Sequence, residues 1–261
     1  GPVHLEGFGG IEGVMKGKGE LYDYLTQQGG QVFVNSTDPR LLQMGQRLKN
    51  PIYYPQATDD YTCSLVQADP FIIYQDRQGQ IVKTNLLGKH QFNNIATALC
   101  VGHYFGVEAK AANRAIQNYQ PLSNRCQLIE RGNHTILLDA YNANPEAMKA
   151  AIQTLQSLHA AQKVLILGDM NELGDECAHF HEELIKLTTQ FDYQAILLYG
   201  PHMEVAQVYN PKALHFKSKE DLVAYLKQAN FKNAVILIKG SRSLRLESLL
   251  DVLWLNDGMS T

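Results

Sequence analysis

Between residues 11 and 25, apolar side chains recur three or four positions apart, which is the spacing of one face of an α-helix. The stripe consists of Ile11, Val14, Leu21 and Leu25. Lys18 falls on the same stripe, and Gly29 and Gly30 follow where a helix C-cap is expected. The pattern predicts one helix that ends before Gly29, with a lysine on its apolar face.

The rest of the first half alternates between short apolar runs and helical patterns, which predicts a mixed α+β region. The expected elements are a strand at 31–35, a helix to Leu48 after a polar turn at 36–39, a hairpin of strands at 71–74 and 81–87, and helices at about 92–105 and 109–119. A polar stretch, residues 75–80, separates the two hairpin strands and supplies their turn.

Beyond residue 121 the pattern becomes a regular alternation of continuous apolar runs with helical segments. The apolar runs are residues 135–139, 164–168, 195–199 and 234–239. Continuously apolar strands that alternate with helices are typical of a mostly parallel sheet covered on both faces, so we predict a Rossmann-like α/β domain. The polar stretch 121–124 is the best linker, which gives expected domains of 1–123 and 124–261.

Composition narrows the class of partner. The formal net charge of −3 gives no basic footprint for nucleic acid or an anionic membrane, so small-molecule ligands are favoured. The four cysteines lie far apart without a C-x-x-C pair, which favours reduced thiols. No apolar run approaches the ~18 residues that would span a membrane. We therefore expect a cytoplasmic protein with no membrane insertion.

Polar residues follow three of the four apolar runs. They occupy 139–145, 168–174 and 239–243. Because ligands of an open parallel sheet bind outside the carboxyl ends of its strands, these loops predict a binding face. We expect Ser241 and Arg242 to lie at a helix N-terminus that binds a phosphate or carboxylate. The alternative, for any single residue, is that it only forms a turn or caps a helix.

Lys18 is the second candidate for chemistry, because burying a free ammonium is costly unless its chemistry changes. A desolvated lysine can lose its proton and take up carbon dioxide, and the resulting carbamate could bind a metal that His4 also holds. The alternative is that the ammonium of Lys18 reaches solvent. The chain contains no G-x-x-x-x-G-K-[ST] motif, so the main phosphate cradle of a nucleotide site is absent from it.

Several stretches together resemble the Mur ligase family. They are Gly1 to Gly9 with Ile11-Glu12-Gly13-Val14 and Lys18-Gly19-Glu20-Leu21, the stretch Leu87 to Asn94, Asp139 to Pro145, Gly168 to Gly174 with His181 downstream, and Lys239-Gly240-Ser241-Arg242. The last three resemble the D-alanyl-D-alanine-adding branch, and the D-N-P-R motif of the diaminopimelate-adding branch is absent. The likeness covers nearly the whole chain but lacks the family's UDP-sugar-binding domain and the first half of its ATPase domain.

The resemblance implies a set of site residues. ATP would be contacted by Gln91 and Asn94 at the adenine, Arg125 near the phosphates, Asp139 at the ribose, and Tyr141. In place of the family's first asparagine stands Gln91, so Asn94 is carried over more firmly. Two magnesium ions would be held with the help of His4 and a carbamylated Lys18. The dipeptide D-alanyl-D-alanine would be bound by Asn142, Asn144, Glu172, Lys239, Ser241 and Arg242.

The implied reaction is ATP-dependent amide formation. ATP would phosphorylate the terminal carboxylate of UDP-N-acetylmuramoyl-tripeptide, and the amine of D-alanyl-D-alanine would attack the acyl phosphate. The opening residues read like the interior of an enzyme, which we expect to be monomeric at full length. Because nothing in the 261 residues replaces the phosphate loop, we expect them alone to be inactive. The alternatives are another amide ligase of the superfamily, such as a folylpolyglutamate synthase, or a module that binds a nucleotide or dipeptide without turnover.

Overall fold

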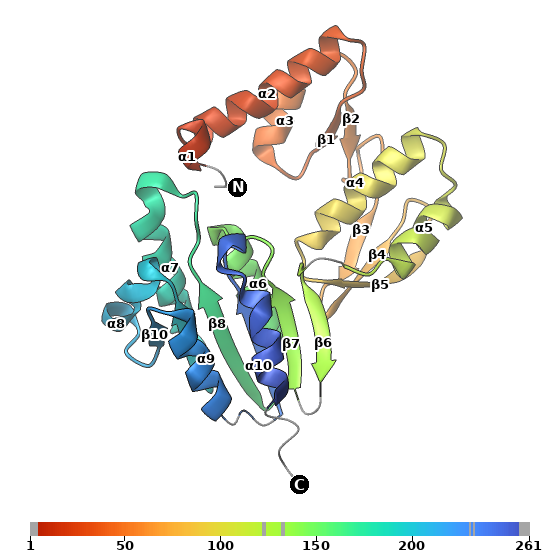
Figure 1. The fold of residues 1–261 in the computed structure, drawn as a ribbon. Helices are drawn as coiled ribbons and strands as arrows, with labels where there is room; N and C mark the ends of the chain where they lie inside the picture. The colour runs from red at the N-terminus through yellow and green to blue at the C-terminus, as the bar shows by residue number, and fades with distance from the viewer. Residues whose placement is uncertain (1–4, 122–123, 132–133, 230, 232, 256–261) are drawn as a thin grey trace. The chain divides into compact units, whose positions relative to one another are not determined.

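The protein folds into two compact units, which are described separately (Figure 1). The structure is a computed structural model that describes residues 5–121, 124–131, 134–229, 231 and 233–255. The first unit comprises residues 11–120, and the second comprises residues 121–261 together with 1–10. Within the described residues no helix is both long and apolar enough to cross a membrane.

The first unit is mixed α/β, as its pattern predicts. Its elements are α2 (Ile11–Gln27), β1 (Phe33–Asn35), α3 (Pro39–Gly45), β2 (Ile52–Tyr54), β3 (Ser64–Gln67), β4 (Phe71–Gln75), β5 (Ile81–Leu87), α4 (Gln91–Tyr104) and α5 (Ala109–Asn118). Strands β1 and β2 form a parallel pair, and β3, β4 and β5 form an antiparallel sheet against which α4 and α5 pack. The predicted hairpin, the helix from Ile11 and the two later helices are confirmed.

The β4–β5 turn shows why this hairpin forms. The carboxylate of Asp76 accepts hydrogen bonds through Oδ1 from the backbone N–H groups of Gln78 and Gln80, at 2.8 and 2.9 Å. Gly79 has φ of 83°, a left-handed conformation that costs glycine little. An acidic residue and a glycine thus close the turn locally, while alternate residues of β5 face the core.

The expectation that Lys18 lies on a buried stripe is wrong for the described residues. Along α2 only Val14 and Gly19 are buried, whereas Lys18 is exposed and Leu21 is 57% exposed. The spacing correctly identified residues that share one helix face. It carries no information on whether another element covers that face, and within the described chain this one is largely open.

The second unit is the predicted α/β domain. Its elements are α1 (Leu5–Phe8), β6 (Gln127–Arg131), β7 (His134–Asp139), α6 (Pro145–Ser157), β8 (Gln162–Gly168), α7 (Cys177–Thr188), β9 (Ala195–Tyr199), α8 (Ala206–Tyr209), β10 (Leu214–Phe216), α9 (Lys219–Gln228), β11 (Ala234–Lys239) and α10 (Leu249–Leu255), with short 3₁₀ turns at Gly174–Glu176, Pro201–Val205, Arg242–Leu244 and Leu246–Ser248. The strand order is β10-β9-β8-β11-β7-β6, and only β6 runs antiparallel to its neighbour.

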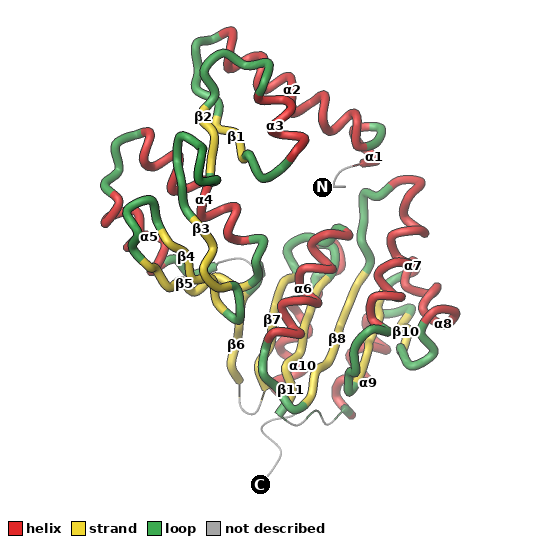
Figure 2. Tube along the Cα trace, turned by 180° about the vertical axis from the view of Figure 1, so that it is seen from behind, coloured by secondary structure: helices red, strands yellow, loops and turns green. Residues whose placement is uncertain are grey.

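Helices cover both faces of this sheet, which explains why its strands are continuously apolar. In opposite views α9 and α10 lie on one face and α6 on the other (Figures 1 and 2). Every residue of β11 is buried, and Ala234, Ile236 and Ile238 pack in one hydrophobic cluster with residues of α9 and α10. Because β7, β8 and β11 are parallel neighbours, their carboxyl ends meet at one edge.

Candidate functional site

The centre of this edge is an ion pair between the ends of two adjacent strands. The ammonium of Lys239 on β11 lies 2.5 Å from Oδ2 of Asp139 on β7, and the Lys239 side chain is only 1% exposed. It also donates to the backbone oxygens of Asn142, at 2.9 Å, and of Asp139, at 3.3 Å. These contacts use all three N–H donors of the lysine, so the buried ammonium of Lys239 fixes the loop that follows β7.

The residues expected to contact ATP within this unit gather around Asp139. Its Oδ1 accepts a hydrogen bond from the backbone N–H of Cys126 at 3.2 Å, which ties the carboxylate to the start of the unit. The guanidinium of the preceding residue, Arg125, lies 3.7 Å from the centre of the exposed Tyr141 ring. Stacking of this kind orders a long cationic side chain at the surface. Arg125, Asp139 and Tyr141 are therefore neighbours in the fold.

Asn142 and Asn144, in the loop after β7, differ in which side-chain groups are still free to bind a ligand. Oδ1 of Asn144 accepts from the backbone N–H of Ala147 at 2.9 Å and caps α6, which the capping preference of asparagine explains. Asn142 is exposed, and its own Oδ1 accepts from the next backbone N–H, of Ala143, at 2.8 Å. Asn144 thus has a structural role already, while the side-chain amide N–H groups of Asn142 lie at the surface.

The loop after β8 is held by two side chains from other elements. Nε2 of His181, on α7, accepts from the backbone N–H of Met170 at 3.0 Å. Oγ of Ser241, which follows β11, accepts from the backbone N–H of Asn171 at 2.8 Å. The Asn171 amide in turn donates to Ser243 Oγ at 2.8 Å. Consecutive backbone amides are therefore fixed, which sets the direction of the loop that carries Glu172.

His181 can make these contacts only as a neutral ring. It is fully buried, and Nδ1 lies 2.7 Å from the backbone oxygen of Cys177, so Nδ1 carries the proton and Nε2 is the acceptor. Burial lowers the pKa of His181, against the opposing effects of the Cys177 carbonyl and of Asp169. Asp169 is 2% exposed, and its Oδ1, which lies 3.8 Å from His181 Nε2, has no hydrogen-bond partner among the described residues.

The end of β11 differs from the expectation. The residues after Ser241 form a three-residue 3₁₀ turn rather than an α-helix, and Arg245 follows with φ of 48°. The N-terminal anion site expected at an α-helix is therefore not formed at Ser241 and Arg242. Arg242 lies at the surface and donates to Glu247 Oε1 at 2.7 Å. Glu172 is exposed and has φ of 64°, so a strained turn presents its side chain at the surface.

The remaining predicted residues lie elsewhere. Gln91 and Asn94 share the first turn of α4 in the first unit, where Asn94 Nδ2 donates to Gln91 Oε1 at 2.7 Å. Lys18 lies on α2 in the same unit, and His4 is outside the described residues. Within the described chain there is no group of three His, Cys, Asp or Glu side chains placed to hold a metal ion.

Asp169 and His181 belong to the stretches that carry the family resemblance, but neither of them was assigned a role in the site from the sequence. The sequence did carry a signal for Asp169, because it comes directly after a fully apolar strand end. The sequence gives a weaker signal for the role of His181. It lies in the middle of a helix, eleven residues after Met170, whose backbone N–H donates to its ring. Only the fold shows that its ring reaches the loop.

The sequence of the chain matches two known domain patterns in succession. Residues 1–102 match the Mur ligase middle domain, and residues 124–242 match the domain described as Mur ligase, glutamate ligase domain. This chain belongs to the Mur ligase family. Arg125 and Cys126 lie at the start of the second matched region of this Mur ligase chain, and the backbone N–H of Cys126 donates to the carboxylate of Asp139.

Curated relatives support the same family. The UDP-N-acetylmuramoyl-tripeptide--D-alanyl-D-alanine ligase of Bacillus subtilis is 30% identical over 261 residues, which cover 96% of this chain and 56% of the relative. The ligase of the same name from Escherichia coli is 28% identical, with coverage of 96% and 58%. The Mur ligase chain thus spans little more than half the length of these relatives.

Solved structures agree with the fold. MurF ligase from Thermotoga maritima in complex with ADP has a TM-score of 0.84 at 24% identity, and the match covers 100% of this chain and 61% of that one. A MurF structure from Acinetobacter baumannii gives the same TM-score and identity, with coverage of 98% and 58%. The α/β fold of the middle and C-terminal regions of a Mur ligase is therefore present here.

Proposed function

We propose that this chain is part of an ATP-dependent ligase that joins D-alanyl-D-alanine to UDP-N-acetylmuramoyl-tripeptide. The observation that carries the proposal is the likeness to ligases of that name along 96% of the chain. The geometry supports it, because three strand-end loops with polar side chains meet at one sheet edge. The activity belongs to the complete enzyme, which acts in the cytoplasm as a monomer.

The dipeptide site in this proposal is the carboxyl edge of the second unit, within a C-terminal domain of 124–261. Arg242 and Asn142 are at the surface and can donate to the dipeptide's carboxylate and amide. Glu172 can accept from its ammonium group. Ser241, Lys239 and Asn144 have their polar atoms occupied within the protein, so their part is to hold the loops in position.

The resemblance implies nucleotide contacts from residues of the middle domain, 1–123, and from residues of the C-terminal domain, and each set lies within its own unit. Asn94 and Gln91 present a side-chain amide pair whose donor and acceptor groups suit the edge of adenine. The carboxylate of Asp139 is held at the sheet edge, where it could accept a hydrogen bond from a ribose hydroxyl. The guanidinium of Arg125, stacked on the ring of Tyr141, would supply positive charge for the phosphates. ATP would activate the tripeptide carboxylate, and the bound dipeptide amine would then displace phosphate.

The complete enzyme would also use two magnesium ions, with Lys18 as a carbamate and His4 as a ligand. The described residues do not by themselves fit a metal ion, because Lys18 is exposed and no cluster of ligands surrounds it. The test of this part is mass spectrometry of the intact full-length enzyme, where a carbamate on Lys18 adds the mass of carbon dioxide.

The decisive experiment for the dipeptide site is an NMR titration of the 261-residue chain with D-alanyl-D-alanine and, separately, with L-alanyl-L-alanine. Shifts confined to residues 140–144, 170–174 and 241–243, and larger for the D enantiomer, would support the site. Arg242→Gln should weaken binding, whereas Lys227→Gln, an exposed lysine on α9, should not. Shifts at the opposite edge of the sheet, or equal shifts with both enantiomers, would place the dipeptide elsewhere.

The activity is tested with the full-length enzyme, by ADP release that depends on both cell-wall substrates. Substrate specificity separates the proposal from a folylpolyglutamate synthase-like ligase, and turnover separates it from a non-catalytic binding module. The 261-residue chain should release no ADP in the same assay, because it contains no phosphate-loop motif. Steady ADP release by this chain, dependent on both substrates, would refute that expectation.

A further inference from the structure

A groove in the first unit has a charge pattern that the ligase reaction does not use. It lies between the first half of β5 and helix α5 and encloses about 860 Å³, which is within the usual range for small-molecule sites. Its lining includes Lys83 from β5 and Lys110, Asn113, Arg114 and Gln117 from α5. We call it the β5–α5 groove.

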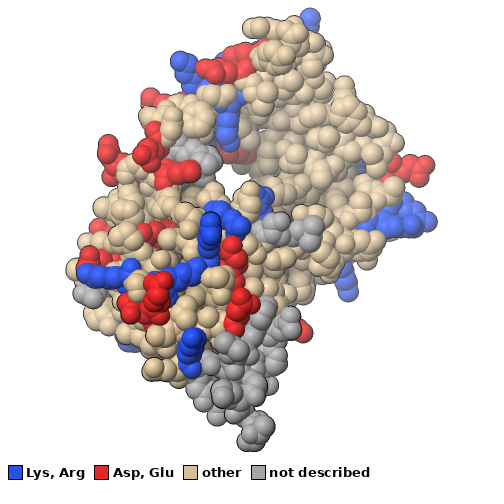
Figure 3. All heavy atoms as spheres, in the orientation of Figure 1, with Lys and Arg blue, Asp and Glu red and all other residues tan. Residues whose placement is uncertain are grey.

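Positive charge dominates this groove. Its lining contains three cations, Lys83, Lys110 and Arg114, and no carboxylate, although the whole chain has more acidic than basic residues. None of the three cations forms an ion pair with another described residue. Lys and Arg side chains can be seen gathered on the surface around α5 (Figure 3). Their charges are therefore not neutralised from within the described chain.

Hydrogen bonds hold the helix of this groove on the sheet. Asn113, in the middle of α5, donates through Nδ2 to Asp76 Oδ2 at 2.7 Å, and its Oδ1 accepts from the hydroxyl of the fully buried Tyr74 at 2.8 Å. Near the C-terminal end of α5, Asn85 Nδ2 on β5 donates to the backbone oxygen of Gln117 at 2.9 Å. The helix is thus tied to the sheet at its middle and near its C-terminal end, so the cations lie on a preformed surface.

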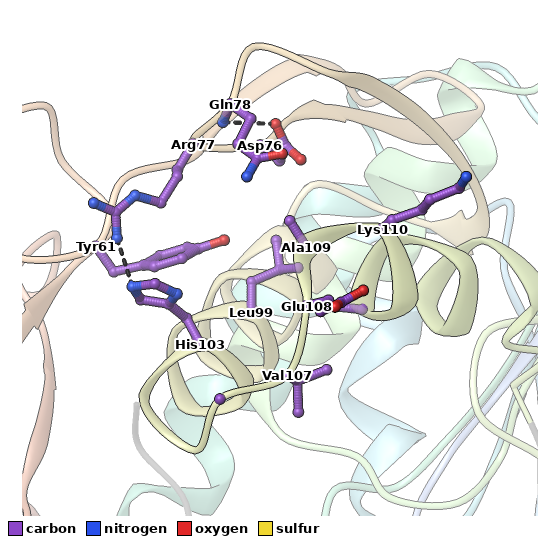
Figure 4. Close-up of a pocket in the computed structure, with 12 residues that line it drawn as sticks. Tyr61, Asp76, Arg77, Gln78, Leu99, His103, Val107, Glu108, Ala109 and Lys110 are labelled. Carbon is purple, nitrogen blue, oxygen red and sulfur yellow. Dashed lines mark hydrogen bonds between the residues drawn. The ribbon is translucent and has the colours of Figure 1, made fainter.

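The neighbouring hollow has a different character. It encloses about 640 Å³ and mixes cations with two carboxylates, Asp76 and Glu108 (Figure 4). The guanidinium of Arg77 there already contacts His103 Nε2, at 2.6 Å. Lys110 lines both spaces, and in the close-up its side chain points away from Arg77 and His103. Of these two spaces, only the β5–α5 groove is lined by cations without a carboxylate.

The groove is also separate from the residues assigned to the nucleotide. Strand β5 enters the groove at Ile81 and leads, after Leu87, to the turn before Gln91. At about 3.3 Å per residue, the strand alone spans ~20 Å. A ligand of the groove and an adenine at Asn94 would thus lie at opposite ends of β5.

We propose that the β5–α5 groove binds a compact polyanion, a small molecule with two or more phosphate or carboxylate groups. Lys110 and Arg114 are four residues apart on one helix and so lie side by side, while Lys83 lines the same groove from the strand. Three exposed cations around one hollow favour a multiply charged ligand, because each contact alone is weak in water. The planar fork of Arg114 suits phosphate and carboxylate alike.

The test is an NMR titration of the 261-residue chain with tripolyphosphate and, in a second arm, with citrate. The expected result is saturable shifts at residues 80–83 and 110–117 with at least one of the two, and the arms show whether phosphate or carboxylate is preferred. Lys83→Gln and Arg114→Gln should each raise Kd about three- to fivefold, as expected for exposed charge contacts. The double variant Lys83→Gln/Arg114→Gln is compared with the matched control Lys16→Gln/Lys49→Gln, which also removes two exposed cations from this unit.

Three results would overturn the proposal. One is the absence of saturable shifts with either anion at low ionic strength. Another is an equal loss of affinity in the control and the Lys83/Arg114 variants, because binding would then follow net charge alone. The third is loss of the shifts in Asn94→Ala, which would assign the anion to the nucleotide site. The inference stands apart from the ligase proposal, since neither titration depends on turnover.

Discussion

Replacing Lys239 by methionine should destabilise the second unit strongly while leaving its sheet order intact. Methionine matches the length of the lysine stem but removes the ammonium. The carboxylate of Asp139 would then keep only the N–H of Cys126 at 3.2 Å, and the backbone oxygen of Asn142 would lose its donor. The buried carboxylate of Asp139 and the partly buried backbone oxygen of Asn142 would thus be left short of partners.

The magnitude follows from burial. The side chains of Lys239 and Asp139 are 1% and 13% exposed, so solvent screens their interaction only slightly. Removing one member of a buried ion pair typically costs about 3–5 kcal/mol, because the other charge remains buried without compensation. For a protein of this size that corresponds to a fall in Tm of roughly 6–20 °C. The loss is a large part of the ~5–15 kcal/mol that stabilises a typical domain.

The assay is equilibrium urea unfolding followed by circular dichroism, with hydrogen exchange to assign the transition to the second unit. Asp139→Asn and the double variant Asp139→Asn/Lys239→Met complete a double-mutant cycle. The double variant should be less destabilised than the sum of the single variants by at least about 1 kcal/mol. Lys227→Met is the matched control, because Lys227 is exposed on α9, and it should stay within about 0.5 kcal/mol of the wild type.

One outcome would refute the reasoning directly. If Lys239→Met changes the free energy of unfolding by less than about 1 kcal/mol, the ion pair does not tie β7 to β11. The same conclusion would follow if the two single variants were additive, since the charges would then act independently.

Three further predictions concern the same unit. Gly200→Ala should cost roughly 2–4 kcal/mol in urea unfolding, because φ is 122° and the new Cβ would lie 2.4 Å from Cγ of Asp169; a neutral effect would contradict the packing. The lowered pKa of His181 means that the unfolded chain binds a proton more readily, so stability should fall as pH drops below about 6.5, by up to ~1.4 kcal/mol per pH unit, and His181→Gln should reduce that slope. Tyr141→Leu should increase the motion of the Arg125 side chain, measured by 15N relaxation at Nε, and unchanged relaxation would count against the stacking.

Much of the fold could be predicted because hydrophobic periodicity is a local signal. The helix from Ile11, the β4–β5 hairpin and the four apolar parallel strands all appear where the pattern places them. The strand order could not be predicted, since β11 is the last strand in sequence yet lies between β7 and β8. Short strands such as β3 were missed because few of their residues are buried, which weakens the alternation.

The site was predictable to the level of its loops and less so to the level of individual atoms. Polar residues after apolar strands correctly indicated a shared edge, as the Asp139–Lys239 contact confirms. The roles within that edge depend on which groups are already satisfied, and a sequence does not state this. Ser241 is engaged by the Asn171 N–H, and the resulting roles stay predictions until ligand binding is measured.

The position of β11 has a consequence for how the protein is made. Asp139 and Lys239 are 100 residues apart, and β7 and β8 are each paired with β11 rather than with each other. During synthesis, β7 and β8 therefore leave the ribosome before β11, the strand that pairs with both of them. The sheet is completed only when residues 234–239 emerge. Until then the edges of both strands that pair with β11 keep their N–H and C=O groups unpaired, so we expect this unit to be more prone to aggregation during translation than one whose sequential strands pair as they appear.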